Sequence, residues 1–131
     1  MKWVSKGKKK TYSIERLRNS FKNAFSGIVS AYKTEQNLLI HSIGLLVNIA
    51  LFFLLKLSLI EICIILFLCF LIISLEMVNT AIEYSVDMAM PQIHPLAKIS
   101  KDVASGAVLI SCIGAIIIGL IIYLPKIIAF F

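Results

Sequence analysis

Three long stretches of the sequence lack charged side chains almost entirely, and stretches of this length are typical of membrane-spanning helices and not of soluble folds. They cover residues 36–55, 62–75 and 103–125. A helix needs about 20 predominantly apolar residues to cross a bilayer, and the second stretch reaches that length when it is extended to residues 57–77. The apolar fraction of the chain, 60%, also exceeds the roughly 45–50% of soluble proteins. We therefore predict one all-α integral membrane domain over residues 1–131, with three transmembrane helices.

The connections follow from the same pattern. We expect a tight turn near residues 56–58 and no break in the second helix before Asp87, because Gly and Pro are absent from that stretch. The expected segments are a basic tail at 1–12, a surface helix at 13–33, transmembrane helices at 36–56, 57–87 and 97–125, and a loop at 88–96.

The distribution of charge predicts the orientation. Residues 1–33 contain nine Lys or Arg side chains and one acid, Glu15. The positive-inside rule then places the N-terminus in the cytoplasm, together with the 88–96 loop, and the C-terminus outside. No removable signal peptide is expected, because polar residues follow the basic start before the first span. The basic tail suits an anionic lipid surface, and we expect no nucleic-acid partner.

An amphipathic helix is predicted before the first span. Apolar side chains recur every three or four residues while basic side chains occupy the other faces, and Ser13 is a suitable N-cap. Such a helix typically lies in the plane of the lipid headgroups. Its apolar positions are Ile14, Leu17, Phe21, Phe25, Ile28 and Tyr32.

Polar side chains form a stripe at the end of the second span. Glu76, Asn79, Glu83 and Asp87 follow one another at steps of three and four, so they share one helix face. Ionisable groups at membrane depth are costly and usually functional. Asp87 and, less clearly, Glu83 fit a solvated helix end as well, whereas Glu76 is flanked by apolar residues and indicates a functional site.

Glu35 supplies a further carboxylate at the start of the first span. Clustered carboxylates repel one another unless a proton or a cation intervenes, and Mg²⁺, which also accompanies ATP, is the simplest cation. Alternatively, Glu35 pairs with Lys33.

A basic cluster opens the third span. Lys98, Lys101 and Ser105 share a face after Pro95, and the free amides of a helix start together with two ammonium groups favour phosphate. Positive-inside anchoring explains Lys98 equally well.

The remaining polar residues give weaker signals of function. His41 and His94 lack metal-ligand spacing, so we expect hydrogen-bonded structural roles, although His94 could touch a nucleotide. The three cysteines lie in apolar spans and are expected to pack as apolar side chains. No phosphate-binding glycine loop is present in the sequence, so nucleotide chemistry requires another architecture.

Two motifs carry a resemblance that extends from about residue 20 to residue 125. The first is E-x-x-N-x-A-x-E at residues 76–83 and the second is A-K-x-x-K-D at residues 97–102. Together with Glu35-Gln36-Asn37 and His41, they resemble the prokaryotic diacylglycerol kinase family. The form His94-Pro95-Leu96-Ala97-Lys98 looks like the undecaprenol kinases of Gram-positive bacteria within it.

The resemblance implies a homotrimeric lipid kinase of the bacterial inner membrane, with active sites at the membrane–cytoplasm boundary. It implies that Glu76 is the base toward the lipid hydroxyl, that Glu35 and Glu83 hold the Mg²⁺ of ATP, and that Asn79 orients the site. The residues implied to contact nucleotide are Asn23, Glu35, Glu83, Gln92, Ile93, His94, Lys101 and Asp102. The residues implied to border the lipid acceptor are Arg16 and Ser105.

Several alternatives remain open at this stage. The resemblance favours undecaprenol as the acceptor, giving undecaprenyl phosphate. Diacylglycerol, giving phosphatidic acid, is the alternative, since both lipids present a hydroxyl at the same depth. A small oligomeric proton or cation channel would also use membrane carboxylates, but it predicts acids spread through the depth of the bilayer. A scaffolding subunit leaves the carboxylate stripe unexplained.

Overall fold

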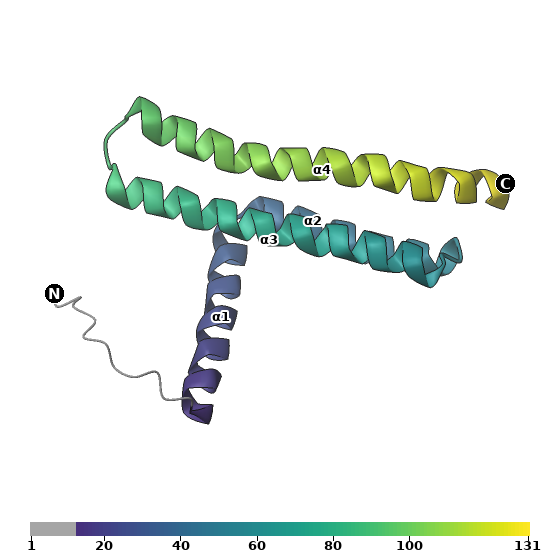
Figure 1. Cartoon of the computed structure of the whole chain (residues 1–131), viewed down its shortest axis with the longest axis horizontal. Coiled ribbons are helices and arrows are strands. Elements are labelled where there is room, and N and C mark those ends of the chain that lie inside the picture. The colour runs from purple at the N-terminus through teal and green to yellow at the C-terminus, as the bar shows by residue number, and fades with distance from the viewer. Residues whose placement is uncertain (1–12) are drawn as a thin grey trace.

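The computed structural model describes residues 13–131, and they form four helices (Figure 1). These are α1 (Ile14–Thr34), α2 (Gln36–Leu54), α3 (Leu59–Ala89) and α4 (Pro95–Phe130). The predicted all-α architecture is confirmed, with three helices, α2 to α4, that are long and apolar enough to cross a membrane. The predicted basic tail at 1–12 lies outside the described residues.

Helix α1 projects steeply away from the other three helices and meets them where α2 begins, while α3 and α4 extend beyond this point (Figure 1). It begins after Ser13, whose hydroxyl accepts a hydrogen bond from the Arg16 amide at 3.1 Å, as its N-cap role predicts. It ends at Glu35, whose extended backbone makes a corner before α2. A hydrogen bond between the Tyr32 and Ser42 hydroxyls then ties α1 to α2. The position of α1 in the headgroup plane stays a prediction.

Helices α2 and α3 form a tight hairpin. Lys56 adopts a left-handed conformation, with φ of 50°, and Ser58 opens α3 with a capping box. The Ser58 hydroxyl accepts from the Glu61 amide at 3.4 Å, and the Glu61 carboxylate accepts from the Ser58 amide at 2.7 Å.

Helix α4 is longer than the expected range 97–125. It starts at Pro95, where a missing N–H costs nothing, and the His94 Nδ1 accepts from the Leu96 amide. It then continues through Pro125 to Phe130 instead of closing at this proline. Proline in a helix interior removes one backbone hydrogen bond, but the helix persists.

Helix α3 is the centre of the fold, because the backbones of α2 and α4 both lie close to it and, within residues 13–131, not close to each other. Ion pairs fasten α3 to α4 at both ends. Glu61 meets Lys126 at 2.9 Å near the α2–α3 turn, and Asp87 meets Lys101 at 2.6 Å at the opposite end. We call these the turn end and the Glu76 end of the bundle. Phe52, Leu57 and Ile65 form a small core at the turn end.

We predict that the Ser58 cap contributes measurably to stability. Ser58→Ala removes the acceptor for the Glu61 amide and should lower the free energy of unfolding by about 1 kcal/mol. Ser85→Ala is the matched control, since the exposed Ser85 hydroxyl only donates to a carbonyl four residues earlier, and it should change stability by less than about 0.5 kcal/mol. Circular dichroism during unfolding in mixed detergent micelles measures both. Equal losses would contradict the role of the cap.

Candidate active site

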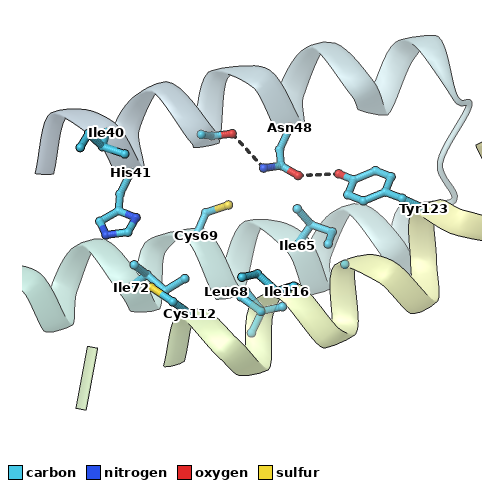
Figure 2. A pocket seen from close by; sticks show the side chains of 13 residues that line it. Ile40, His41, Asn48, Ile65, Leu68, Cys69, Ile72, Cys112, Ile116 and Tyr123 are labelled. Atoms are coloured by element: carbon cyan, nitrogen blue, oxygen red, sulfur yellow. Dashed lines mark hydrogen bonds between the residues drawn. The ribbon is translucent and has the colours of Figure 1, made fainter. Parts of the chain in front are cut away.

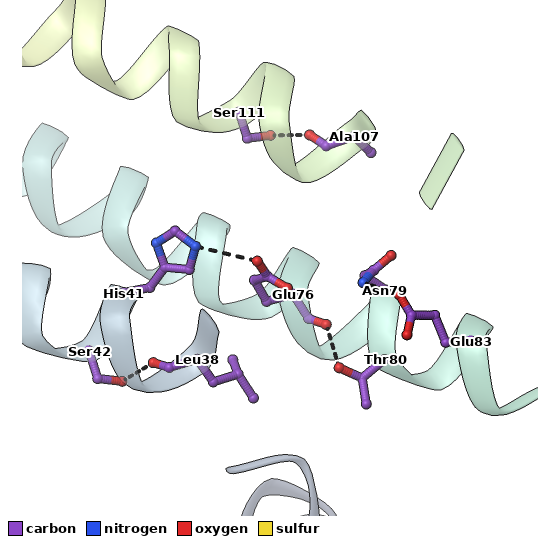
Figure 3. A network of polar contacts seen from close by, with 9 residues as sticks. All are labelled: Leu38, His41, Ser42, Glu76, Asn79, Thr80, Glu83, Ala107 and Ser111. Atoms are coloured by element: carbon purple, nitrogen blue, oxygen red, sulfur yellow. Dashed lines mark hydrogen bonds and ion pairs between the residues drawn. The ribbon is translucent and has the colours of Figure 1, made fainter. Parts of the chain in front are cut away.

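Glu76 is a buried carboxylate at the end of the apolar part of α3. Its residue is only 3% exposed, and the Nε2 atom of His41 lies 3.4 Å from Glu76 Oε1. Figure 3 shows the His41 ring of α2 directed at this carboxylate. The neighbouring Thr80 is also buried, and its hydroxyl donates to the Glu76 carbonyl oxygen at 3.0 Å. An imidazole from another helix therefore faces the most buried acid of the described chain.

Asn79 and Glu83 continue the same face of α3. The Asn79 Nδ2 donates to Glu83 Oε1 at 3.0 Å, so the two side chains are held together (Figure 3). The other polar atom of the amide, Asn79 Oδ1, is buried and has no hydrogen-bond partner in the described chain. Asn79 is 7% exposed. Buried polar atoms are nearly always paired, so this oxygen indicates a missing donor or cation.

The stripe predicted from helix periodicity is therefore present for Glu76, Asn79 and Glu83. Asp87, one turn further, is exposed and pairs with Lys101. This agrees with the interpretation of Asp87 as part of a solvated helix end, and it gives Asp87 a definite partner.

The basic cluster of α4 already has carboxylate partners within the chain. Lys101 pairs with Asp87 and Lys98 pairs with Asp102. The Ser105 hydroxyl donates to the Asp102 carbonyl oxygen at 3.1 Å. A phosphate bound here must therefore compete with Asp87 and Asp102 for the two ammonium groups.

The other predicted site residues lie on separate elements. Glu35 is the N-cap residue of α2, and its side chain makes no capping hydrogen bond. Asn23 and Arg16 are exposed on α1, and Gln92, Ile93 and His94 are exposed in the loop before α4. Across residues 13–131, no three His, Cys, Asp or Glu side chains gather closely enough to hold a metal ion.

An apolar cavity of about 350 Å³ begins beside the Glu76–His41 pair. It lies over α3, between α2 and α4, and runs toward the turn end (Figure 2). Ile40 and Ile116, which are 54% and 62% exposed, stand on its rim, so the cavity is open at the surface. The other residues that line it are His41, Gly44, Asn48, Ile65, Leu68, Cys69, Ile72, Cys112, Ala115, Gly119 and Tyr123.

Two features of this region were not predicted. His41 was expected only to be hydrogen-bonded. Counting from the shared turn does not reveal its pairing with Glu76, because His41 lies 13 residues before the end of α2 and Glu76 lies 17 residues after the start of α3. The hydrogen bond from the Tyr123 hydroxyl to Asn48 Oδ1 joins residues 75 positions apart. The only signal in the sequence was a polar residue within each apolar stretch.

Comparison with known proteins identifies the family of the chain. The prokaryotic diacylglycerol kinase family matches residues 22–123. An undecaprenol kinase of Bacillus subtilis is 42% identical over 86% of this chain and 92% of its own length. A diacylglycerol kinase of Synechocystis is 38% identical over 84% of this chain and 63% of its own length. One from Haemophilus influenzae is 33% identical over 87% and 98%, respectively. These matches, over most of the chain, show that it belongs to the prokaryotic diacylglycerol kinase family.

Proposed function

We propose that this protein is an integral membrane lipid kinase that transfers the γ-phosphoryl group of MgATP to the hydroxyl of undecaprenol, giving undecaprenyl phosphate. Membership in the family supports the lipid kinase activity, and the similarity to an undecaprenol kinase over most of both chains favours that acceptor. The structural observation that carries the proposal is the buried Glu76 carboxylate, placed where an apolar cavity meets a polar helix end.

Glu76 is proposed to act as the general base. A lipid alcohol is too weak an acid to lose its proton in advance, so the proton moves to Glu76 as the new oxygen–phosphorus bond forms. The bond between the γ-phosphorus and its bridging oxygen breaks in the same step, and ADP leaves. Because phosphoryl transfer needs little covalent chemistry from protein, positioning and charge provide the rest of the rate enhancement.

His41 is proposed to orient this base. Its Nε2 atom faces one carboxylate oxygen of Glu76, which restricts rotation of the carboxylate and leaves the second oxygen for the acceptor hydroxyl. Asn79 is proposed to orient the site from the other side, through the amide oxygen that lacks a partner in this chain.

The donor set at the polar end of the stripe suits Mg²⁺. Asn79 and Glu83 offer amide and carboxylate oxygens, which a hard cation prefers, and the unpaired Asn79 Oδ1 is consistent with a charge nearby. Mg²⁺ usually uses one or two carboxylates together with substrate phosphates, so the lack of a complete protein cage in residues 13–131 fits. Glu35 and Glu83 are proposed to hold it. When bound, Mg²⁺ would neutralise charge on the phosphates.

The nucleotide is proposed to bind on the cytoplasmic side of the Glu76 end. Lys101 would exchange its Asp87 partner for a phosphate of the nucleotide. Asp102 would contact the nucleotide once its ion pair with Lys98 opens. Asn23 on α1 and the loop residues Gln92, Ile93 and His94 would border the nucleotide. Arg16 would lie beside the lipid headgroup and Ser105 beside the acceptor.

We further propose a homotrimer in the bacterial inner membrane with its N-terminus in the cytoplasm. The basic charge before α2 supports the orientation. The scatter of nucleotide-contacting residues over α1, the loop and α4 supports a site completed by a second copy, because polar groups at membrane depth need a protein or water environment.

The location of the acids opposes the channel alternative. On α3 they are Glu61 at the turn end, which is paired with Lys126, and the stripe at the Glu76 end. The cavity between the two ends has a largely apolar lining, so the described chain offers no continuous path of acids for protons or cations.

We predict that Glu76→Gln abolishes turnover while ATP binding is largely retained. Loss of a general base typically costs about 10²- to 10⁴-fold in rate, and the amide preserves the shape of the side chain. Steady-state kinetics and equilibrium nucleotide binding measure the two effects, and Glu15→Gln on the exposed face of α1 is the control. If ATP binding disappears together with activity, Glu76 is a ligand and not the base.

Glu83→Gln and Glu35→Gln are expected to raise the Mg²⁺ concentration needed for half-maximal activity, because each removes one proposed carboxylate ligand. Excess Mg²⁺ should restore part of the rate. Glu61→Gln, at the turn end of the same bundle, should leave the Mg²⁺ requirement unchanged. A loss of activity that no Mg²⁺ concentration relieves, with nucleotide affinity intact, would show that the metal assignment is wrong.

The acceptor can be identified directly. Purified protein in mixed native lipids with labelled ATP and Mg²⁺ should transfer label to undecaprenol in preference to dioleoylglycerol, by at least the factor of ten that corresponds to about 1.4 kcal/mol. Preferential labelling of dioleoylglycerol would assign the protein as a diacylglycerol kinase. Ion flux through proteoliposomes without ATP would favour the channel.

A further inference from the structure

The cavity beside Glu76 is closed at its far end by a polar bridge. The Tyr123 hydroxyl donates to Asn48 Oδ1 at 2.6 Å, and the Asn48 Nδ2 donates to the Gly44 carbonyl oxygen at 2.8 Å. Figure 2 shows the bridge at one end of the cavity and His41 at the other. Both polar groups of the Asn48 side chain are thus satisfied, as hydrocarbon surroundings require.

This bridge is a direct link across the open side of the cavity. The backbones of α2 and α4 each lie close to α3 and, in the described part of the chain, not close to each other. The Asn48 and Tyr123 side chains reach over α3 to join them. The space between α2 and α4 is therefore open from His41 as far as the bridge and is crossed there.

The cavity adjoins the proposed reaction centre through His41. His41 both lines the cavity and faces Glu76, so a molecule in the cavity ends beside the base. The volume of about 350 Å³ is at the small end of the range for ligand sites. His41 and Asn48 are seven residues apart on α2, a rise of about 10 Å. This space holds the first part of a lipid chain and not the whole of undecaprenol.

We infer that the Asn48–Tyr123 bridge is the end stop of an acceptor groove, and that Asn48 and Tyr123 determine how deep the acceptor chain lies between α2 and α4. The inference rests on the proposed lipid kinase function. The hydrocarbon chain of the acceptor is the occupant, because the lining is largely apolar and the groove ends at the base. Where the acceptor chain meets the bridge, it turns out through the open side of the groove and continues in the bilayer.

The bridge is expected to affect the position of the bound acceptor and not its binding affinity. A lipid chain that moves from the bilayer into an apolar groove gains little from the hydrophobic effect, because lipid tails are as apolar as leucine. A fixed depth does set the height of the hydroxyl relative to Glu76. Misplacement by a small distance is costly in rate, so the end stop affects turnover more than binding.

The test measures the dependence of rate on chain length in detergent micelles, with acceptors compared at equal mole fraction. The series is geraniol, farnesol, geranylgeraniol and undecaprenol. For the unmodified protein we expect kcat/KM to rise with chain length until the groove is full and then to level off within the series. Tyr123→Phe should move this break to a longer prenol and lower kcat for undecaprenol, because the acceptor hydroxyl is then held less firmly at the height of Glu76.

Two further variants keep the test independent of folding. Tyr123→Phe leaves Asn48 Oδ1 unpaired, so the double variant Asn48→Leu with Tyr123→Phe, which leaves no orphan polar atom, should shift the break in the same direction. Gly119→Leu should move it to a shorter prenol, because Gly119 lines the cavity beside the bridge and a Cβ there meets Tyr123 only at 3.9 Å.

Gly114→Leu is the matched control. Gly114 lies on the same helix outside the cavity lining, and a Cβ there meets no atom within 4 Å, so the break should not move. The inference is overturned if the break is the same in all variants, or if Gly114→Leu moves it as far as Gly119→Leu. It is also overturned if Gly119→Leu changes the oligomeric mass and leaves the break in place, because the cavity then seats a second copy. If the unmodified protein phosphorylates no lipid alcohol, the proposed function itself has failed.

Discussion

The interaction on which the rest of the structure depends is the one that stabilises the buried Glu76 carboxylate, where the apolar part of α3 ends. A carboxylate at membrane depth is unfavourable by several kcal/mol unless it has polar neighbours. Here it has one facing side chain, the His41 imidazole, and it lies one turn from the buried Asn79 amide. The stripe then passes through Glu83 to Asp87, which is exposed. Polarity increases along one helix from a dry end to a wet end, and this gradient is what a reaction between a lipid and a soluble nucleotide requires.

The two ends of α3 serve different purposes. At the turn end, a capping box and the Glu61–Lys126 ion pair close the hairpin and fasten α4. At the Glu76 end, Asp87 and Lys101 hold the same two helices together, but with groups that a phosphate could displace. The hydrophobic effect does not drive helices together in lipid. The two ion pairs therefore help to fix how α3 and α4 are aligned along their length. A tie that can open beside the site therefore allows the polar end to adapt to a ligand while the turn end stays fixed.

The sequence predicts much of this arrangement, because helix spans and helix faces are local properties. Residues three and four apart must share a face, which is why Glu76, Asn79 and Glu83 could be placed together before the structure was known. Contacts between helices are not local. The pairing of His41 with Glu76, and the Asn48–Tyr123 bridge, depend on how antiparallel helices are aligned, and a shift of one turn would separate each pair. The continuation of α4 through Pro125 could not be predicted either, since proline ends some helices and is tolerated in others.

The incompleteness of the site within one chain is itself informative. Asn79 Oδ1 has no partner in residues 13–131, Glu35 makes no capping bond at the α1–α2 corner, and the loop residues 92–94 are exposed. A buried amide oxygen without a partner is rarely tolerated, and a nucleotide needs contacts on more than one side. ATP with its cation can satisfy Asn79, but the exposed groups of α1 and of the loop still need a surface to converge on. A second copy of the chain packed against α3 would supply such a surface, and it would also cover apolar side chains that α3 exposes outside the acceptor groove, such as Phe67 and Phe70. The same polar requirement that buries Glu76 in one chain thus favours an assembly in which the site is closed by another.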